Sequence, residues 1–290
     1  MLLANIYVAR KIQETFPESS LLRRHPKPSA NSFEQLIKAV AEMGFVINPE
    51  TSKTLSDSLD ACVLPADPYF NKLVRIMTTR CMMQAVYFCS GTIASQEYWH
   101  YGLATEIYTH FTSPIRRYSD LVVHRLLSVA IGYDTSRDSS LIDKVKTKEM
   151  SDILNYRNRQ AQQAARSSVE LYTNIFFRGK TLVEPCYIIR ILKNGFSVLI
   201  PRYGVEGFVY SAKTGMDPCL KLVDSSLHSL DDSVILRLFQ KVQVKLVIQE
   251  TGGSVQRDKL TLTLIEPAIA GMNDELETSK NPVSKKRSRG

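Results

Sequence analysis

Cysteine is scarce in this sequence, and long apolar runs are absent. The five cysteines are scattered over 290 residues and form no C-x-x-C pair, so no disulfide framework is indicated. Reduced thiols of this kind are typical of an intracellular protein. No run approaches eighteen apolar residues, which argues against a membrane span. The short opening run Met-Leu-Leu-Ala is expected to belong to a helix rather than to a secretory signal. The sequence also lacks a Walker loop and a dinucleotide-binding fingerprint.

Acidic residues suited to a metal site are few as well. The first aspartate is Asp57, which is predicted to share one helix face with Asp60. Because a hard divalent cation needs several carboxylate oxygens, we expect both to be solvated helix acids and predict no metal ligands. A metal hydrolase using His100, His110 and His124 is the alternative. It is disfavoured because their spacings do not fit two ligands on one helix, and no paired carboxylate accompanies them.

The charge balance favours a polyanionic partner. Lysine and arginine number 37 against 29 acidic residues, which gives a formal net charge of +8. The length allows two domains, and the ordinary composition argues against wholesale disorder. Residues 269–290 end in a Lys/Arg cluster and are predicted to be a disordered basic tail. Such a cluster is only weak evidence for nuclear import. The protein is therefore expected in the nucleus, in the cytoplasm or in both.

Residues 1–178 are predicted to be mostly helical. Apolar residues recur at three- and four-residue spacing from Leu2, after a Ser32–Gln35 capping box, and from residue 67 to residue 88. Residues 21–28, rich in Arg, His and Pro, are expected to form a loop. Helical patterns return between residues 141 and 177. There Arg166 and neighbouring arginines form either a solvated face or the lining of a nucleic-acid groove.

From about residue 181 the apolar period becomes that of strands. Five strands are predicted, at residues 186–192, 196–200, 204–210, 243–249 and 259–264. Five short strands in this length suggest a small closed barrel of OB type, spanning residues 179–268, a fold that commonly binds single-stranded nucleic acid. Candidate contacts are Lys193, Phe196, Tyr203 and Phe208, although strand alternation would place about half of such aromatic residues in the core.

Residues 108–127 hold the most informative motif. Thr112 and Ser113 are expected to cap a helix, with Pro114 in its first turn. The predicted buried face consists of Ile115, Tyr118, Leu121, Val122 and Leu126. Arg116 and Arg117 then fall where the helix dipole is positive and acids are normally favoured. Two guanidinium groups beside free N–H groups and hydroxyls would clamp a phosphate, whereas the alternative is that both are solvated or pair with acids such as Asp120.

The motif resembles the signature of the RNase II/RNase R exoribonucleases, the RNB family. The resemblance rests on His110-Phe-Thr-Ser-Pro-Ile-Arg-Arg-Tyr-Ser-Asp120 with Leu-Val-Val-His-Arg125, and on blocks at Met1–Asn5, Leu21–Pro26, Asp57–Asp60, Arg80–Met83 and His100–Ala104. These blocks are most similar to the eukaryotic branch that serves as a catalytic subunit of the RNA exosome. The implied fold is α+β: a mostly helical C-terminal half of an RNB catalytic domain, followed by a five-stranded OB-type barrel.

The resemblance also implies an activity and its residues. The family hydrolyses single-stranded RNA from its 3′ end, releases nucleoside 5′-monophosphates, uses Mg²⁺ and works with exosome core subunits. Arg116 would be the catalytic residue that contacts the phosphate at the cleaved bond. Thr112, Ser113, Arg117 and Tyr118 would support or extend this clamp. The block at residues 21–28 would border the RNA path, which makes Arg24 and His25 candidate contacts, and Arg23 beside them.

The family's metal-binding aspartate cluster has no counterpart in this sequence. In the family the opening helix lies within the catalytic domain, so we expect the chain to be a C-terminal fragment. The prediction is therefore an exoribonuclease by family that binds RNA and hydrolyses it poorly or not at all alone. A non-catalytic RNA-binding or exosome-docking product is the alternative.

Overall fold

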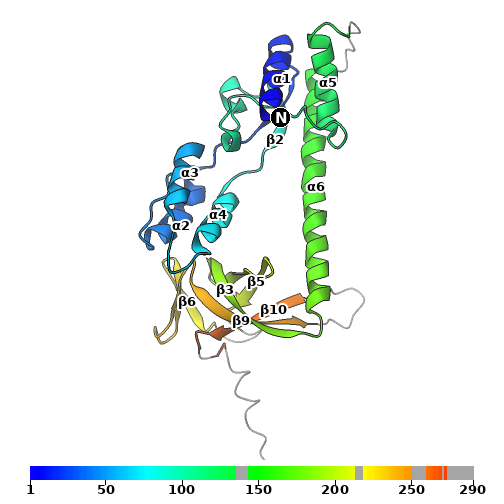
Figure 1. Ribbon diagram of the computed structural model, residues 1–290. Helices are drawn as coiled ribbons and strands as arrows, with labels where there is room; N and C mark the ends of the chain where they lie inside the picture. The colour runs from blue at the N-terminus through cyan, green and yellow to red at the C-terminus, as the bar shows by residue number, and fades with distance from the viewer. Residues whose placement is uncertain (135–142, 213–217, 250–258, 270, 273–290) are drawn as a thin grey trace, which may run out of the picture. The chain divides into compact units, whose positions relative to one another are not determined.

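The computed structural model describes residues 1–134, 143–212, 218–249, 259–269 and 271–272 (Figure 1). It divides into two compact units, residues 1–166 and 167–290. The predicted domain limits at residues 178 and 268 stay predictions. The tail from residue 273 onward lies outside the described residues.

Unit 1 is mostly helical. Its elements are α1 (Leu2–Thr15), β1 (Leu21–Arg24), α2 (Ala30–Ala41), α3 (Ser52–Ala61), α4 (Phe70–Cys81), β2 (Val86–Cys89), three 3₁₀ turns (Ser90–Thr92, Ser95–Tyr98 and Tyr101–Leu103), α5 (Tyr118–Ala130) and the first part of α6 (Lys144–Phe177). The core lies where α1 and α5 meet the β1–β2 pair. Ile12, Leu21, Val123 and Leu126 are almost fully buried there.

Three local predictions for unit 1 were wrong. Residues 21–24 form β1 rather than a loop, and residues 86–89 form β2 rather than the end of the preceding helix. The two segments pair antiparallel, with Leu21 opposite Cys89, and these backbone hydrogen bonds override the local pattern. The second helix also begins earlier than expected, because Ser29 rather than Ser32 is its N-cap residue.

Unit 2 is built on an antiparallel sheet of five strands that curls into a half-barrel (Figure 1). The strands are β3 (Thr181–Leu192), β4 (Gly195–Ile200), β5 (Val205–Tyr210), β9 (Lys241–Gln249) and β10 (Lys259–Glu266), in the order β10-β9-β3-β4-β5. All five predicted strands are confirmed. Among the described residues no hydrogen-bonded ladder joins the edge strands β5 and β10, yet a Cβ on Gly207 would come within 2.2 Å of Leu262 Cδ1. The two edges therefore touch.

A second small sheet in unit 2 was not predicted. It consists of β6 (Leu220–Val223), β7 (Ser226–Ser229) and β8 (Ile235–Leu236). Each strand contributes one apolar residue, Leu220, Leu227 or Leu236, to the core beneath the half-barrel. The strands are too short and too polar to show a clear alternation in the sequence.

Candidate nucleic-acid interface

The turn before α5 carries Arg116. The helix begins at Tyr118 with Arg117 as N-cap residue, so Thr112 and Ser113 do not cap it and Arg116 lies outside its first turn. The N–H groups of Arg116 and Arg117 approach Ser113 O at 3.3 and 3.2 Å. Residues 113–117 are thus folded back on themselves ahead of the helix, contrary to the prediction.

A buried carboxylate stabilises this turn. Asp120 Oδ2 accepts a hydrogen bond from Ser113 N at 2.6 Å and another from Arg117 Nη2 at 2.8 Å. The Asp120 side chain is 0% exposed. The acid in the first turn of α5 thereby satisfies the Ser113 N–H of the preceding turn, and it also suits the positive end of the helix dipole.

The turn leaves Arg116 facing solvent. Its side chain is exposed, and no hydrogen bond or ion pair to it is found within the described part of the chain. The predicted apolar face is only partly right, because Ile115, Tyr118 and Leu121 are exposed while Val122 and Leu126 are buried. Arg117 is thus held by Asp120, whereas Arg116 pairs with no acid among the described residues and is accessible to solvent.

The remaining signature residues surround this turn. Thr112 and Ser113 are half-buried, and their hydroxyls make no hydrogen bond to a described residue. Tyr118 is 59% exposed. Ser113, on the same turn as Arg116, therefore has a hydroxyl that no described residue engages. The roles predicted for these residues stay predictions.

Two further residues from the RNA-path block already have protein partners. Arg24 forms an ion pair with Glu97 at 2.7 Å. His25 is 8% exposed, its Nδ1 lies 3.0 Å from the Gly102 N–H, and its Nε2 lies 2.7 Å from Met83 O. Since Nδ1 accepts from an amide and Nε2 donates to a carbonyl, both ring nitrogens are occupied. These contacts favour a structural role for His25, and its predicted contact with RNA stays a prediction.

Sequence reasoning missed a polar cluster behind the turn. Tyr87 Oη lies 2.6 Å from His110 Nδ1 and 3.0 Å from Ser119 Oγ, and the Arg23 guanidinium lies 4.8 Å from the centre of the Tyr87 ring. Burial, aided by the charges of Arg23 and Arg117, lowers the pKa of His110 to about 3. The pairing of β1 with β2 places Arg23 opposite Tyr87. That pairing had no signal in the sequence.

In unit 2 the predicted contacts differ in accessibility. Lys193 is exposed in the β3–β4 turn, and Phe208 is half-buried beside Tyr210, with ring centroids 4.7 Å apart. Phe208 also lines a cavity of about 680 Å³ along the β5–β10 seam. Phe196, however, is 0% exposed in the core, because β4 directs it inward. Its ring has no face free for a base, which corrects that candidate.

Tyr203 lies in a second, shallower depression of unit 2. Its ring packs edge-on against Phe177 at 5.0 Å, its hydroxyl donates to Glu184 Oε1 at 3.1 Å, and the Arg202 guanidinium lies 5.4 Å from its centre. Tyr172 and Phe176 line the same depression. Aromatic rings beside cations are a usual platform for nucleic-acid bases.

Arg166 is exposed on α6, with no hydrogen bond or ion pair among the described residues, so its predicted contact with RNA stays a prediction.

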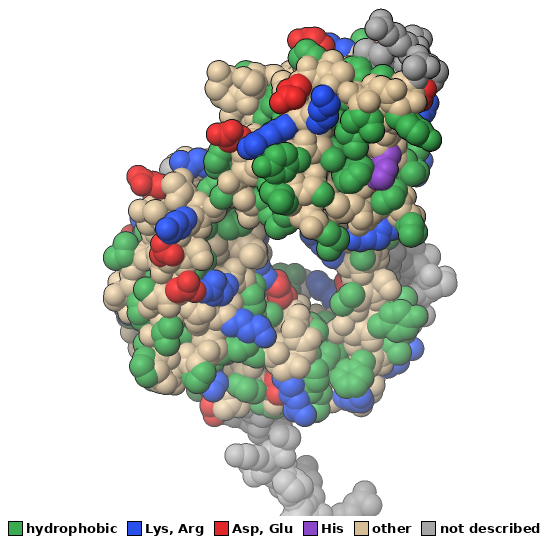
Figure 2. Space-filling model, turned by 45° about the horizontal axis from the view of Figure 1, so that its top comes forward, with side chains coloured by type: hydrophobic (Ala, Val, Ile, Leu, Met, Phe, Trp, Pro, Cys, Tyr) green, Lys and Arg blue, Asp and Glu red, His purple; other side chains and the backbone are tan. Residues whose placement is uncertain are grey.

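In the space-filling view, lysine and arginine side chains are scattered among hydrophobic and other groups on the face shown (Figure 2). On this face, charge alone therefore does not mark an interface. Within the described residues, no helix is long and apolar enough to cross a membrane.

The described residues do not fit a metal ion of the kind the family uses. They contain no group of three or more His, Cys, Asp or Glu side chains able to hold one. Asp60 is paired with Arg75 at 2.5 Å, and Asp57 is an exposed helix acid. The adjacent pair Asp231 and Asp232 is also engaged by protein groups.

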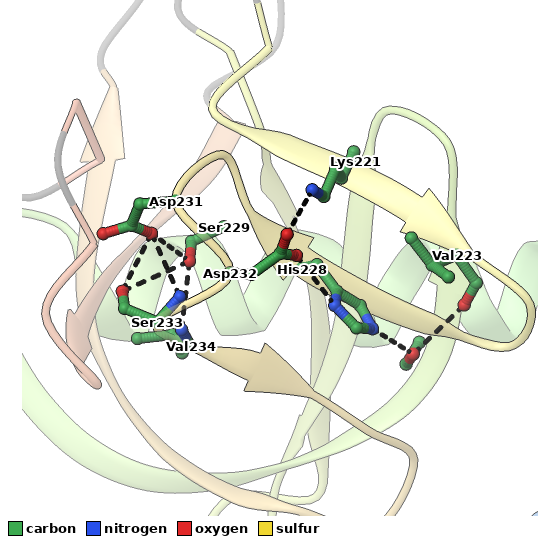
Figure 3. A network of polar contacts seen from close by, with 9 residues as sticks. Lys221, Val223, His228, Ser229, Asp231, Asp232, Ser233 and Val234 are labelled. Carbon is green, nitrogen blue, oxygen red and sulfur yellow. Dashed lines mark hydrogen bonds and ion pairs between the residues drawn. The ribbon is translucent and has the colours of Figure 1, made fainter.

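Asp231 and Asp232 lie after β7, in a network of polar contacts on the small sheet (Figure 3). Asp231 Oδ1 accepts hydrogen bonds from the hydroxyls of Ser229 and Ser233, which help to lower its pKa to about 2. Asp232 bridges Lys221, at 2.7 Å, and His228, at 3.1 Å. These contacts give both carboxylates a role in closing the turn.

Comparison with known proteins identifies both parts of the chain. Residues 1–132 match the RNB domain, and residues 182–261 match the S1 domain. Residues 1–132 belong to the RNB family. Human exosome complex exonuclease RRP44 is 45% identical over 281 residues, which are 96% of this chain and 29% of RRP44. The chain thus spans less than a third of that relative's length.

Two solved structures share the fold. Apo RNase R of Mycoplasma genitalium has a TM-score of 0.72 at 23% identity, over 91% of this chain and 40% of that chain. Yeast Ssd1, described as a pseudonuclease, has a TM-score of 0.70 at 21% identity, over 91% of this chain and 43% of that chain. The RNB and S1 fold is therefore found both in a ribonuclease and in a pseudonuclease, so fold alone does not decide activity.

Proposed function

We propose that this chain forms the phosphate-binding and RNA-guiding part of a 3′-to-5′ exoribonuclease that acts with the RNA exosome and releases nucleoside 5′-monophosphates. Membership of the RNB family and 45% identity to an exosome exonuclease support the reaction class. The observation that carries the proposal is Arg116, an exposed guanidinium without a protein partner among the described residues, on a turn fixed by a buried carboxylate.

The geometry suits electrostatic stabilisation of a phosphate. A guanidinium presents a rigid fork of donors that matches phosphate oxygens, and Asp120 fixes the backbone from which that fork projects. Arg116 would stabilise the charge that develops on the scissile phosphate. Removing one preorganised donor of this kind typically costs about 3 kcal/mol of transition-state stabilisation, roughly a hundredfold in rate.

Unit 2 would hold the RNA strand. The S1 domain forms a curled sheet of the OB type, which commonly combines aromatic stacking with a cationic groove. Phe208, Tyr203 and Lys193 are the accessible predicted contacts. Exosome core subunits are the proposed protein partners, and a nuclear location, a cytoplasmic one or both are proposed on the same basis.

The isolated chain is proposed to bind RNA and to hydrolyse it poorly or not at all. RNB-family exoribonucleases are generally metal-dependent, with Mg²⁺ the proposed ion, and the described residues offer no carboxylate cluster for one. This absence favours a second candidate function, a non-catalytic RNA-binding or exosome-docking protein. The two differ in whether the chain forms part of a working active site.

A binding and shortening assay tests the proposal. Single-stranded RNA with a 5′ label would be incubated with the pure chain, with and without Mg²⁺. We expect binding without shortening, and weaker binding by Arg116→Ala. Arg10→Ala, which removes the same charge from another exposed position of unit 1, is the matched control. Equal affinity of both variants and the wild type would refute the role of Arg116, and robust stepwise shortening would refute the proposed inactivity.

A further inference from the structure

The Tyr87 hydroxyl sets the protonation of His110. Ser119 Oγ lies 3.0 Å from Tyr87 Oη as a donor, so the tyrosine proton is left for His110 Nδ1 at 2.6 Å. Nδ1 is then an acceptor, and the ring proton of the neutral imidazole resides on Nε2. Nε2 has no hydrogen-bond partner among the described residues. His110 therefore offers a free N–H donor from a fixed ring.

Two guanidinium groups beside His110 also have unused donors. Arg23 stacks on the Tyr87 ring at 4.8 Å, and within the described residues its guanidinium makes no hydrogen bond. Arg117 donates one N–H to Asp120, but its Nε is buried without a partner. A buried charged donor left unpaired costs free energy that a bound acceptor would recover.

The cluster has more cationic donors than its single acid can satisfy. Asp120 already accepts from Ser113 N and Arg117 Nη2, at 2.6 and 2.8 Å. Tyr108 and His100 are the other groups against the His110 side of the cluster, and neither carries a negative charge. With two arginines and one aspartate, the described cluster is one positive charge in excess.

We propose that Arg23, Arg117 and the Nε2–H of His110 bind one phosphate group of the RNA backbone, as a subsite distinct from the contact at Arg116. The inference rests on the proposed function, since it assumes that RNA lies along this face of unit 1. A tetrahedral phosphate with several acceptor oxygens suits two guanidinium forks and one imidazole N–H. The subsite is a positioning device and requires no metal ion.

Two arginines of unit 1 give a matched pair of variants. Arg23→Gln removes the guanidinium that lies over Tyr87, whereas Arg10→Gln removes the same charge from an exposed position on α1. Oligouridylate affinity would be measured by fluorescence anisotropy over a range of salt concentrations. We expect Arg23→Gln to weaken binding about tenfold and to reduce the slope against log salt by roughly 0.7, the value for one phosphate contact on a single strand. Arg10→Gln should leave both values nearly unchanged.

A measurement on the unmodified chain tests the subsite without depending on whether the variants fold. The His110 ring resonances would be followed by NMR while inorganic phosphate, and separately oligouridylate, is added at neutral pH. We expect both ligands to shift the Nε2 signal, with oligouridylate acting at far lower concentration. An effect of phosphate alone would indicate a free-anion site and overturn the RNA subsite, as would no effect of either.

The variants also separate this inference from the proposed function. If Arg116→Ala weakens RNA binding while Arg23→Gln behaves like Arg10→Gln, the subsite is refuted and the proposed function stands. If neither Arg116→Ala nor Arg23→Gln weakens binding, both are refuted. Circular dichroism at the assay temperature would establish that each variant is folded.

Discussion

Arg117 and Asp120 form an ion pair with 2.8 Å between Nη2 and Oδ2, and the aspartate side chain is completely buried. The pair joins the N-cap residue of α5 to its first turn, and the same carboxylate holds the Ser113 N–H. Asp120 thus shapes the turn from which Arg116 projects. One acid organises two adjacent arginines, one through direct pairing and the other through the backbone.

We expect Asp120→Ala to destabilise unit 1 by about 3–5 kcal/mol, because it leaves Arg117 and the Ser113 amide without their buried acceptor. The free energy of unfolding from urea titration would measure the loss. Asp57→Ala, which removes an exposed helix acid, is the control and should change stability by less than about 0.5 kcal/mol. Similar effects of the two substitutions would contradict the role of the buried pair.

His25 should prove to be a structural residue. His25→Ala removes an acceptor for the Gly102 N–H and a donor to Met83 O, so we expect a loss of roughly 1–3 kcal/mol in unfolding free energy. RNA affinity, corrected for the folded fraction, should stay within about twofold of the wild type, since both ring nitrogens face the protein. Thermal unfolding and anisotropy on the same samples check this. A large loss of affinity at full stability would restore His25 as a contact.

The sequence predicted the half-barrel well and the β1–β2 pair badly, for one physical reason. The strands of the half-barrel carry long alternating or β-branched runs, so local pattern and tertiary burial agree. In β1, Arg23 and Arg24 interrupt the pattern after two leucines, and the partner strand lies more than sixty residues away. Such pairing depends on long-range backbone hydrogen bonds, which a local pattern does not contain.

The candidate site was predictable only in part. The signature motif singled out Arg116, which is exposed and has no hydrogen bond or ion pair among the described residues, and its contact with a phosphate stays a prediction. The motif did not reveal that Asp120 would be fully buried, which moves the start of α5 from residue 114 to Tyr118. Nor did it reveal His110 as the neighbour of Tyr87, because the contact depends on where β2 lies.

Substitution of two phenylalanines of the half-barrel should affect different properties, stability in one case and RNA affinity in the other. Phe196→Ala empties a core position and should cost about 3–5 kcal/mol in unfolding free energy, with any loss of RNA binding due to unfolding. Phe208→Ala, on the neighbouring strand, should weaken RNA binding by about 1–3 kcal/mol, the usual value of one stacked base, at a much smaller cost in stability. Denaturant titration and anisotropy would separate the two effects. Normal RNA binding by Phe208→Ala would remove Phe208 from the interface.

Stability should fall with acidity because two histidines are held neutral in unit 1. Burial is the main cause that lowers the pKa of His100 to about 4 and that of His110 to about 3. Between the ordinary histidine pKa of about 6.5 and these values, the unfolded chain takes up protons that the folded chain does not. Unfolding free energy should therefore decrease as pH falls from about 6.5, by at most about 1.4 kcal/mol per pH unit for each histidine. Urea titrations at several pH values would show a shallower dependence in His110→Gln, whereas an unchanged slope would mean that His110 is not held neutral by the fold.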